Sequence, residues 1–347
     1  MHSPEKAKDR IRQKRRRTLG IVIAGLFVLL LVWFLCSKEP HKEAVERPVS
    51  TPAQPPAPAP VLDDGLAPTA DPGARELSGF LAALEQKNVR YNWNDIRPAE
   101  IPWEYHRKTK NNHPLMFARF GEATGNCVLF MGGVHGDELP TVYLMLRLAH
   151  YLQENPAVVK NRCIVIAPLV NPDGYLAEKP TRVNASGVDV NRNFPTRKWH
   201  ADAHRHWQNK GRKNPRYYPG PKAASEQETL FQIALIKRFK PQKIMSVHSP
   251  LNFFDYDGPS ADLDSFEQWM ERMARAANHP VKRFGYYPGS LGNYAGNERN
   301  IFTLTLELPT SDPALAAEYF SRFKPSFLKF IDLPITGSPP NTRMFNH

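Results

Sequence analysis

The sequence predicts an α/β fold in which helices flank a mixed, largely parallel sheet. Short apolar runs alternate with longer amphipathic segments, and this alternation is typical of strand–helix units that build one sheet. The expected strands are 115–120, 127–132, 162–169, 242–248 and 301–308. The expected helices are 76–88, 138–153, 225–239, 262–277 and a last one from about 312.

Turn and cap residues set the expected ends of these elements. Each expected strand is followed within a few residues by Gly, Pro or Asn, which favour turns over continued strand. Ser225 followed by Glu228 is the pattern of a capping box, so we expect Ser225 to start the helix 225–239.

The first 36 residues predict a membrane anchor that precedes the fold. Residues 1–18 carry eight Lys or Arg and two acidic residues, and residues 19–36 (LGIVIAGLFVLLLVWFLC) are uncharged and long enough to cross a bilayer core. A basic flank keeps its end of the chain in the cytoplasm, so we expect 1–18 to be a cytoplasmic tail and 19–36 a single transmembrane helix. A cleaved signal peptide is the alternative, but the charged KEPHKE that follows lacks a small-residue cleavage pattern.

Composition divides the remaining chain into a tether, a domain and a tail. Nine prolines fall within residues 37–74, which bury too little apolar surface to fold and predict a disordered tether. The patterned part, 75–335, predicts the catalytic domain, and 336–347 a C-terminal tail. An anchor with a long tether implies a substrate in the periplasm, at some distance from the inner membrane.

The net charge of +12 does not indicate a nucleic-acid partner. Residues 1–18 contribute +6, half of the total, and the anchor that follows them accounts for this charge. We therefore expect no nucleic-acid binding.

Two of the three cysteines lie at the start of expected strands. Cys127 and Cys163 can pair if those strands are neighbours and the compartment is oxidising. Buried free thiols are the simpler state, and we expect that state. Cys36 lies at the edge of the predicted membrane helix.

Polar side chains follow the ends of three expected strands. His135 and Glu138 follow one strand, His248 ends another, and Glu307 ends the last. Ligands of such sheets bind beyond the carboxyl ends of the strands. Each residue alone has an ordinary structural explanation, but four of them at one sheet edge favour a binding or catalytic site.

The residue types at this edge indicate zinc. A catalytic zinc site uses three protein ligands and leaves a fourth position open, and His135, Glu138 and His248 form a suitable set. Glu307 then remains as a base that takes a proton from the attacking water.

Five motifs in this order resemble those of the zinc carboxypeptidase family, whose members have the carboxypeptidase A-like fold, a phosphorylase/hydrolase-type α/β fold. They are HGDE at 135–138, NPDG at 171–174, TRVNASGVDVNRNFP at 181–195, SVHSP at 246–250 and LTLELP at 304–309. The resemblance covers roughly residues 100–330 and implies a zinc metallopeptidase with one zinc ion per chain.

The resemblance also assigns roles to individual residues. It implies that His135, Glu138 and His248 bind zinc, that Glu307 is the general base, and that Arg182 stabilises the oxyanion.

Three residues of the GVDVNRN stretch receive binding or orienting roles from the same resemblance. Asn191 and Arg192 would bind the terminal carboxylate of the substrate, and Asp189 would orient a ligating histidine. The alternative for NRN is a polar turn with an ordinary surface arginine.

Within the family, the chain most resembles the bacterial murein peptide amidases, which cut the γ-D-glutamyl–diaminopimelate bond of cell-wall peptides. The closer match rests on TRVNASGVDVNRNFP, on YYPGPKAASEQET and on DYDGP at 255–259. It implies a peptidoglycan stem peptide as substrate. A carboxypeptidase that trims the terminal residue and a non-catalytic wall-binding protein are the alternatives, and the oligomeric state stays open.

The sequence leaves the roles of several candidate substrate-binding residues undecided. Tyr286 and Tyr287 both lie where the family has a tyrosine that covers the substrate. Asp255, Asp257 and Asn293 would suit the distal amino and carboxyl groups of diaminopimelate, and a solvated loop explains them almost as well.

The segment WHADAHRHW, residues 199–207, contains three histidines and suggests a second metal site. Its basic surroundings favour an exposed insertion instead, and we expect the latter.

Overall fold

A mixed eight-stranded sheet forms the centre of the computed structural model, which describes residues 72–122, 127–259, 263–282, 285 and 287–335. The strand order is β1-β2-β4-β3-β5-β8-β6-β7. The four strands β4, β3, β5 and β8 are parallel, β2 and β6 pair antiparallel to their inner neighbours, and β7 pairs parallel with β6. The strands are β1 (Glu104–Lys108), β2 (Pro114–Phe120), β3 (Val128–Met131), β4 (Ile164–Ala167), β5 (Lys243–His248), β6 (Phe253–Gly258), β7 (Val281–Lys282) and β8 (Phe302–Glu307).

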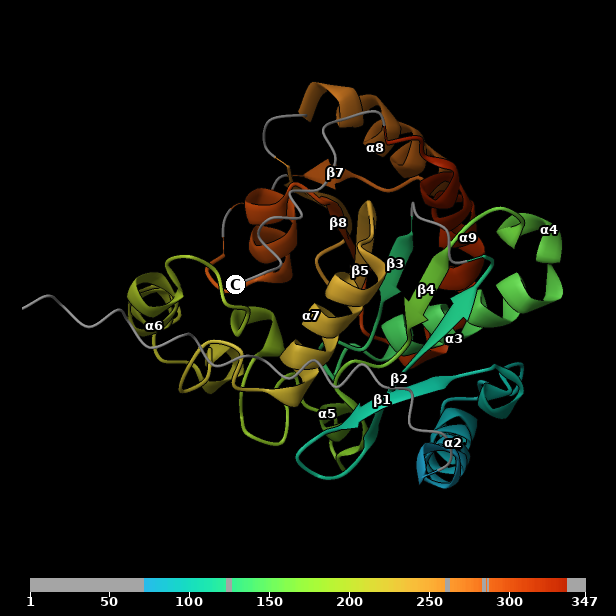
Figure 1. Cartoon of the computed structure of the whole chain (residues 1–347), viewed down its shortest axis with the longest axis horizontal. Coiled ribbons are helices and arrows are strands. Elements are labelled where there is room, and N and C mark those ends of the chain that lie inside the picture. The colour runs from blue at the N-terminus through green and yellow to red at the C-terminus, as the bar shows by residue number, and fades with distance from the viewer. Residues whose placement is uncertain (1–71, 123–126, 260–262, 283–284, 286, 336–347) are drawn as a thin grey trace, which may run out of the picture. The chain divides into compact units, whose positions relative to one another are not determined.

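Helices cover both faces of this sheet (Figure 1). The helices are α2 (Pro72–Arg90), α3 (Leu139–Glu154), α4 (Pro156–Val159), α5 (Pro172–Leu176), α6 (Trp199–Asn209), α7 (Gln227–Phe239), α8 (Leu263–Ala277) and α9 (Ala316–Asp332). Phe130 of β3 packs in one core with α3, α8 and α9, and its neighbour Leu129 packs in the other core with α7. Because both faces are covered, β3 is apolar at every position and lacks the alternation of a half-exposed strand.

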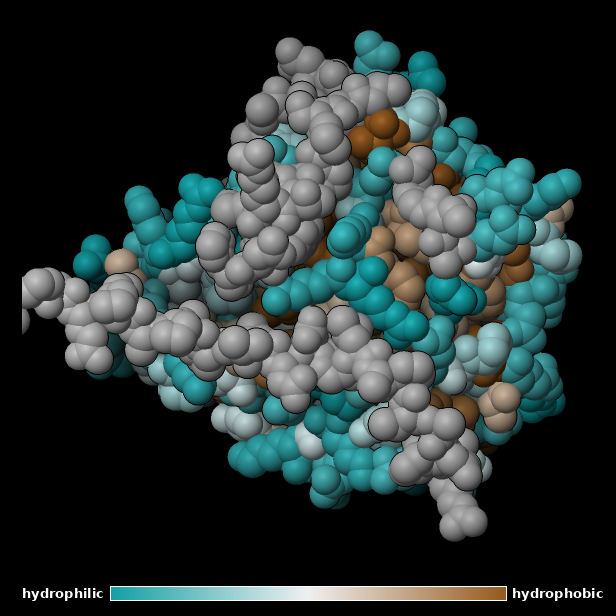
Figure 2. Space-filling model, viewed as in Figure 1, coloured by the Kyte–Doolittle hydropathy of each residue, from teal (hydrophilic) through white to brown (hydrophobic). Residues whose placement is uncertain are grey.

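The described part of the face shown in Figure 2 is largely hydrophilic. Hydrophobic residues are visible there only in patches between hydrophilic ones. Among the residues that the structure describes, the large exposed apolar side chains lie apart from one another in the sequence, at Val89, Tyr217, Leu251 and Val281.

Cys127 and Cys163 form a disulfide, so the expectation of free thiols is wrong. The parallel register of β3 and β4 places Val128 opposite Ile164, and the two cysteines directly precede this pair. Their Cα atoms are 4.5 Å apart, within the range that a disulfide bridges. The sequence did not show that these two strands are neighbours.

The predicted capping box at Ser225 is also wrong. Helix α7 begins at Gln227 with Glu226 as its N-cap residue, and no side chain caps it. Ser225 Oγ instead donates to Glu226 Oε1 at 2.6 Å. Glu228 is buried and accepts a hydrogen bond from Asn184. The side chains of Ser225 and Glu228 therefore bind other groups and do not form a capping box.

The predicted N-terminal segments 1–18 and 19–36 and the tail 336–347 lie outside the described residues. Among the described residues, no helix is both long and apolar enough to span a bilayer, and the anchor therefore stays a prediction. Helix α2 begins at Pro72, so the last residues of the expected tether 37–74 belong to this helix.

Candidate active site

The turn after β3 carries two of the predicted metal ligands. β3 ends at Met131 and α3 begins at Leu139, so His135 and Glu138 lie on the connection between them. Glu138 is the N-cap residue of α3, yet its side chain does not cap the helix and is available to the site. A side chain at Gly136 would collide with the backbone of Gly174 in the NPDG turn, so this glycine permits the close contact between the two turns.

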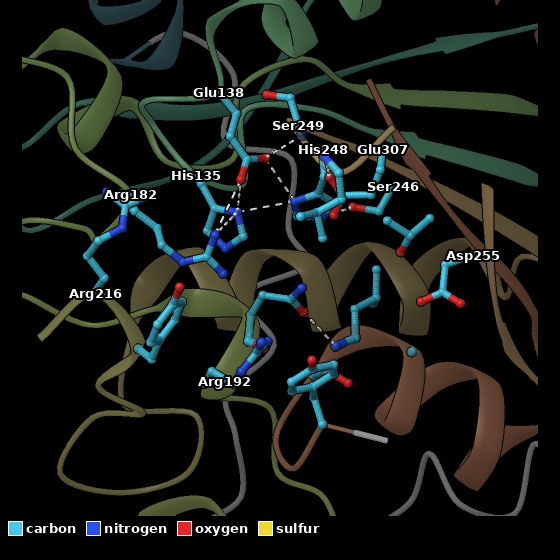
Figure 3. A pocket seen from close by; sticks show the side chains of 18 of the residues that line it. His135, Glu138, Arg182, Arg192, Arg216, Ser246, His248, Ser249, Asp255 and Glu307 are labelled. Carbon is cyan, nitrogen blue, oxygen red and sulfur yellow. Dashed lines mark hydrogen bonds and ion pairs between the residues drawn. The ribbon is translucent and has the colours of Figure 1, made fainter. Parts of the chain in front are cut away.

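His135, Glu138 and His248 meet at one buried point at the sheet edge (Figure 3). Their ligand atoms all lie within 4.8 Å of one another. The Nδ1 atoms of the two histidines are 3.1 Å apart, and each lies within 3.0 Å of an oxygen of Glu138. Two imidazole nitrogens and a carboxylate directed at one point fit a shared cation, and this donor set is one that zinc prefers.

A second set of contacts holds the two imidazole rings in place. His135 Nε2 lies 3.1 Å from Asp189 Oδ1, and His248 Nε2 lies 2.9 Å from Ser246 Oγ. Both rings therefore keep Nδ1 directed into the site, as metal-ligating histidines require. Burial raises the pKa of Asp189, but the charges of Arg182 and His135 and the hydrogen bond to His135 together outweigh burial and hold this pKa well below its ordinary value. Ser246 is a contact that the sequence did not indicate.

Arg182 lies beside the buried triad and is itself mostly buried, with 13% of its side chain exposed. Its Nη2 pairs with Asp189 Oδ2 at 2.9 Å, and its Nη1 lies 3.3 Å from Glu138 Oε1. Burial lowers the pKa of Arg182, but Asp189 and Glu138 outweigh burial and raise it. A fixed cation of this kind suits a position where negative charge develops during a reaction.

Asn191 and Arg192 lie on the short 3₁₀ turn Val190–Arg192 and line the same pocket. Asn191 Oδ1 accepts a hydrogen bond from the backbone of Leu291 at 2.8 Å. The guanidinium of Arg192 lies over the ring of Tyr287, 4.5 Å from its centroid. The alternative of a turn with an ordinary surface arginine does not describe this placement. Tyr287 also lines the pocket, whereas Tyr286 lies outside the described residues.

Glu307 ends β8 directly opposite His248 at the end of β5, because the two residues are paired in the parallel register. Its Oε2 accepts a hydrogen bond from the backbone of Leu251 at 3.3 Å. Burial, reinforced by the charge of Glu138 and opposed by that of His248, raises the pKa of Glu307. A carboxylate with a raised pKa is a better proton acceptor at neutral pH.

Comparison with known proteins agrees with this geometry. The zinc carboxypeptidase family model matches residues 107–320. The chain belongs to the zinc carboxypeptidase family. It is 30% identical over 209 residues to murein peptide amidase A of Vibrio campbellii, with 59% of this chain and 78% of that protein covered. It is 29% identical over 221 residues to murein peptide amidase A of Escherichia coli K12, with 62% and 85% covered.

The fold of this zinc carboxypeptidase also matches a solved structure. The carboxypeptidase A of Helicoverpa armigera superposes with a TM-score of 0.56 at 17% identity, covering 74% of this chain and 72% of that one. The predicted fold is thus confirmed for the folded domain. The chain is a zinc-dependent hydrolase related to the murein peptide amidases.

The active-site pocket of the zinc carboxypeptidase has a volume of about 650 Å³ and includes the aspartates of β6. Asp255 and Asp257 both line it, so a solvated loop does not describe them. Asp257 Oδ2 accepts a hydrogen bond from Thr305 Oγ1 at 2.6 Å. Burial, followed by the charge of Asp255, raises the pKa of Asp257 to about 7. Asn293 is buried in the short π-helix Gly292–Asn297 and does not line this pocket.

The segment 199–207 is not an exposed insertion in this zinc carboxypeptidase. All of it lies in α6, where Trp199 is 1% exposed and donates through Nε1 to the backbone carbonyl of Arg192 at 2.8 Å. His206 lines the active-site pocket and packs against the ring of Tyr287. The sequence showed the histidines but not that the helix forms a wall of the site.

Proposed function

We propose that this zinc carboxypeptidase hydrolyses peptidoglycan stem peptides at the γ-D-glutamyl–diaminopimelate amide bond. The observation that carries this proposal is the convergence, in one pocket, of a metal-binding triad with a carboxylate and two half-buried arginines. Murein peptide amidases A of two bacteria are among its relatives, and they supply the substrate class.

The residues around the triad suit amide hydrolysis. A zinc ion held by His135, Glu138 and His248 supplies Lewis acidity, which polarises an amide carbonyl and activates water at neutral pH. Glu307 accepts the proton of the attacking water at its carboxylate and returns it to the leaving nitrogen. Arg182 faces the oxygen on which negative charge develops.

The other side of the pocket suits a leaving residue with a free carboxylate. The guanidinium of Arg192 matches a carboxylate geometrically, and Asn191 adds an amide beside it. Tyr287 packs against this guanidinium and would cover a leaving residue bound to it. Diaminopimelate at the end of a stem tripeptide presents such a carboxylate.

We also propose that 19–36 anchors the protein in the inner membrane, with the catalytic domain in the periplasm. The basic flank 1–18 supports this orientation. The disulfide of Cys127 and Cys163 supports it independently, because such bonds persist mainly in oxidising compartments.

Product analysis tests the bond that is cleaved. The zinc-loaded protein should release free diaminopimelate from L-Ala-γ-D-Glu-diaminopimelate, as measured by mass spectrometry. A substrate with the α-carboxylate of diaminopimelate converted to an amide should react poorly, because Arg192 loses its partner. Release of only a terminal D-alanine from longer stem peptides would instead support the trimming carboxypeptidase.

A further inference from the structure

A basic segment, residues 197–222, forms one wall of the active-site pocket and has no part in the mechanism above. It carries eight Lys or Arg and only one acidic residue, Asp202. The residues of this segment that line the pocket are His206, Lys210, Gly211, Arg216 and Tyr217. An excess of positive charge beside a catalytic centre attracts anionic groups of a substrate.

The loop that presents Arg216 is held by specific contacts. Trp207 Nε1 donates to the carbonyl of Asn214 at 2.8 Å, and the ring of Trp207 packs 5.1 Å from that of Tyr218. The side chain of Asn214 in turn accepts from the backbone N–H of Arg216 at 3.0 Å. The backbone at Arg216 is therefore fixed relative to α6.

The side chain of Arg216 is fixed at the mouth of the site. Its Nη1 pairs at 2.7 Å with Asp137, which lies between the two metal ligands of the HGDE turn. About half of the Arg216 side chain (51%) is exposed, so it remains accessible from the pocket. The ion pair engages Nη1, and a guanidinium has further N–H donors for a second carboxylate.

The position of Arg216 assigns it to the acyl side of the scissile bond. In the view of Figure 3, Arg216 and Arg182 lie toward one side of the pocket, and Glu307 and Asp255 lie toward the other. In the proposed function, the leaving residue extends from the scissile carbonyl toward Arg192, and the carbonyl faces Arg182. The acyl group therefore extends past Arg182 toward Arg216.

We propose that Arg216 is a specificity-determining residue that binds a free carboxylate on the acyl side of the scissile bond. This inference rests on the proposed function, and it names the α-carboxylate of a γ-linked glutamyl residue as the group that is bound. A γ-glutamyl amide keeps this carboxylate free near the scissile carbonyl, whereas an ordinary α-peptide bond leaves no such charge there. The planar guanidinium of arginine is suited to this recognition.

A pair of acyl-side products tests the proposal without any turnover. L-Ala-D-Glu and L-Ala-D-isoglutamine differ only in whether the α-group is a carboxylate or an amide. The zinc-loaded full-length protein should bind L-Ala-D-Glu about tenfold more tightly by calorimetry, since a charge-assisted hydrogen bond at a half-exposed site is worth roughly this factor. Arg216→Gln should remove the preference. Arg205→Gln, which removes the same charge from the exposed face of α6, should keep it.

Kinetics with the matching substrates separates this proposal from the proposed function. With L-Ala-γ-D-Glu-diaminopimelate, Arg216→Gln should lower kcat/KM about tenfold, and with the isoglutaminyl analogue it should change kcat/KM little.

Release of diaminopimelate by the wild type with no effect of Arg216→Gln would overturn the role of Arg216 and leave the proposed function standing. If no diaminopimelate is released, the function fails, and the binding pair still decides the role of Arg216. Equal affinity of the wild type for both products, or a preference that survives Arg216→Gln, would overturn it.

Discussion

Glu228 is a buried carboxyl group that takes no part in the proposed chemistry. Its Oε2 accepts a hydrogen bond from Asn184 at 2.9 Å, and the same amide donates to Glu226 at 2.8 Å. Burial, followed by the nearby charges of Asp173 and Glu226, raises the pKa of Glu228 from 4.5 to about 7. The carboxyl group of Glu228 therefore binds its proton more tightly in the folded state than in the unfolded state. The contribution of Glu228 to the free energy of unfolding is therefore greatest below about pH 4.5, and it is lost as the pH rises through about 7.

The substitution Glu228→Gln should remove this pH dependence. Glutamine keeps an oxygen for the amide of Asn184 and has no charge to bury, so the variant should be more stable than the wild type at pH 8, by up to about 3 kcal/mol. Urea unfolding at pH 5 and pH 8 measures the difference, with the exposed Glu267→Gln as control. A gain at pH 8 no larger than the gain at pH 5 would contradict the assignment.

The central site residues were predictable because each stands at the end of an expected strand. Parallel strands bring their carboxyl ends to one edge, and the pairing of His248 with Glu307 is the direct result. From the sequence, Asp255 could not be decided between substrate binding and a solvated loop, and no pattern placed Arg216 in the pocket. Their positions depend on the pairing of β6 with β8 and on the folded loop 210–217, and neither leaves a periodic pattern.

At the scale of elements, the disulfide links the starts of β3 and β4. It closes a loop between residues 36 positions apart, which limits the freedom of the unfolded chain. Cys127→Ser should therefore lower the free energy of unfolding by about 2–4 kcal/mol. Denaturant unfolding with and without a reducing agent measures this. Reduction should bring the wild type close to the variant, and an unchanged midpoint in both experiments would show that the bond does not contribute.

The long apolar strands and helices were predicted, and the short or polar ones were not. β2, β3, β4, β5 and β8 are buried and match the expected apolar runs. β1, with the sequence EYHRK, is half-buried at the sheet edge, and β6, with the sequence FFDYDG, carries the two pocket aspartates. Both segments form strands because of the strands they pair with, although their own residues have little preference for a strand. The pattern of hydrophobic residues in the sequence does not reveal such strands.

At the scale of the whole molecule, we predict that the catalytic domain lies on the periplasmic side of the inner membrane. A reporter enzyme that works only outside the cytoplasm, fused after His347, should be active. The basic flank 1–18 is the cause, so replacing its Lys and Arg residues with Gln should reduce this activity. Activity of a cytoplasm-only reporter at the same position would contradict the orientation.

The central claim is that Glu307 moves the proton while His135, Glu138 and His248 hold the metal. Glu307→Gln keeps the size of the side chain and removes its basicity. Zinc content and the circular dichroism spectrum should therefore be unchanged, while kcat falls by about 10²–10⁴-fold or more. His248→Ala should instead lose the zinc as well as the activity. The deciding measurement is the kcat of zinc-loaded Glu307→Gln on a substrate that the wild type cleaves: a loss of this size is predicted, and near-normal turnover with zinc bound would contradict the account.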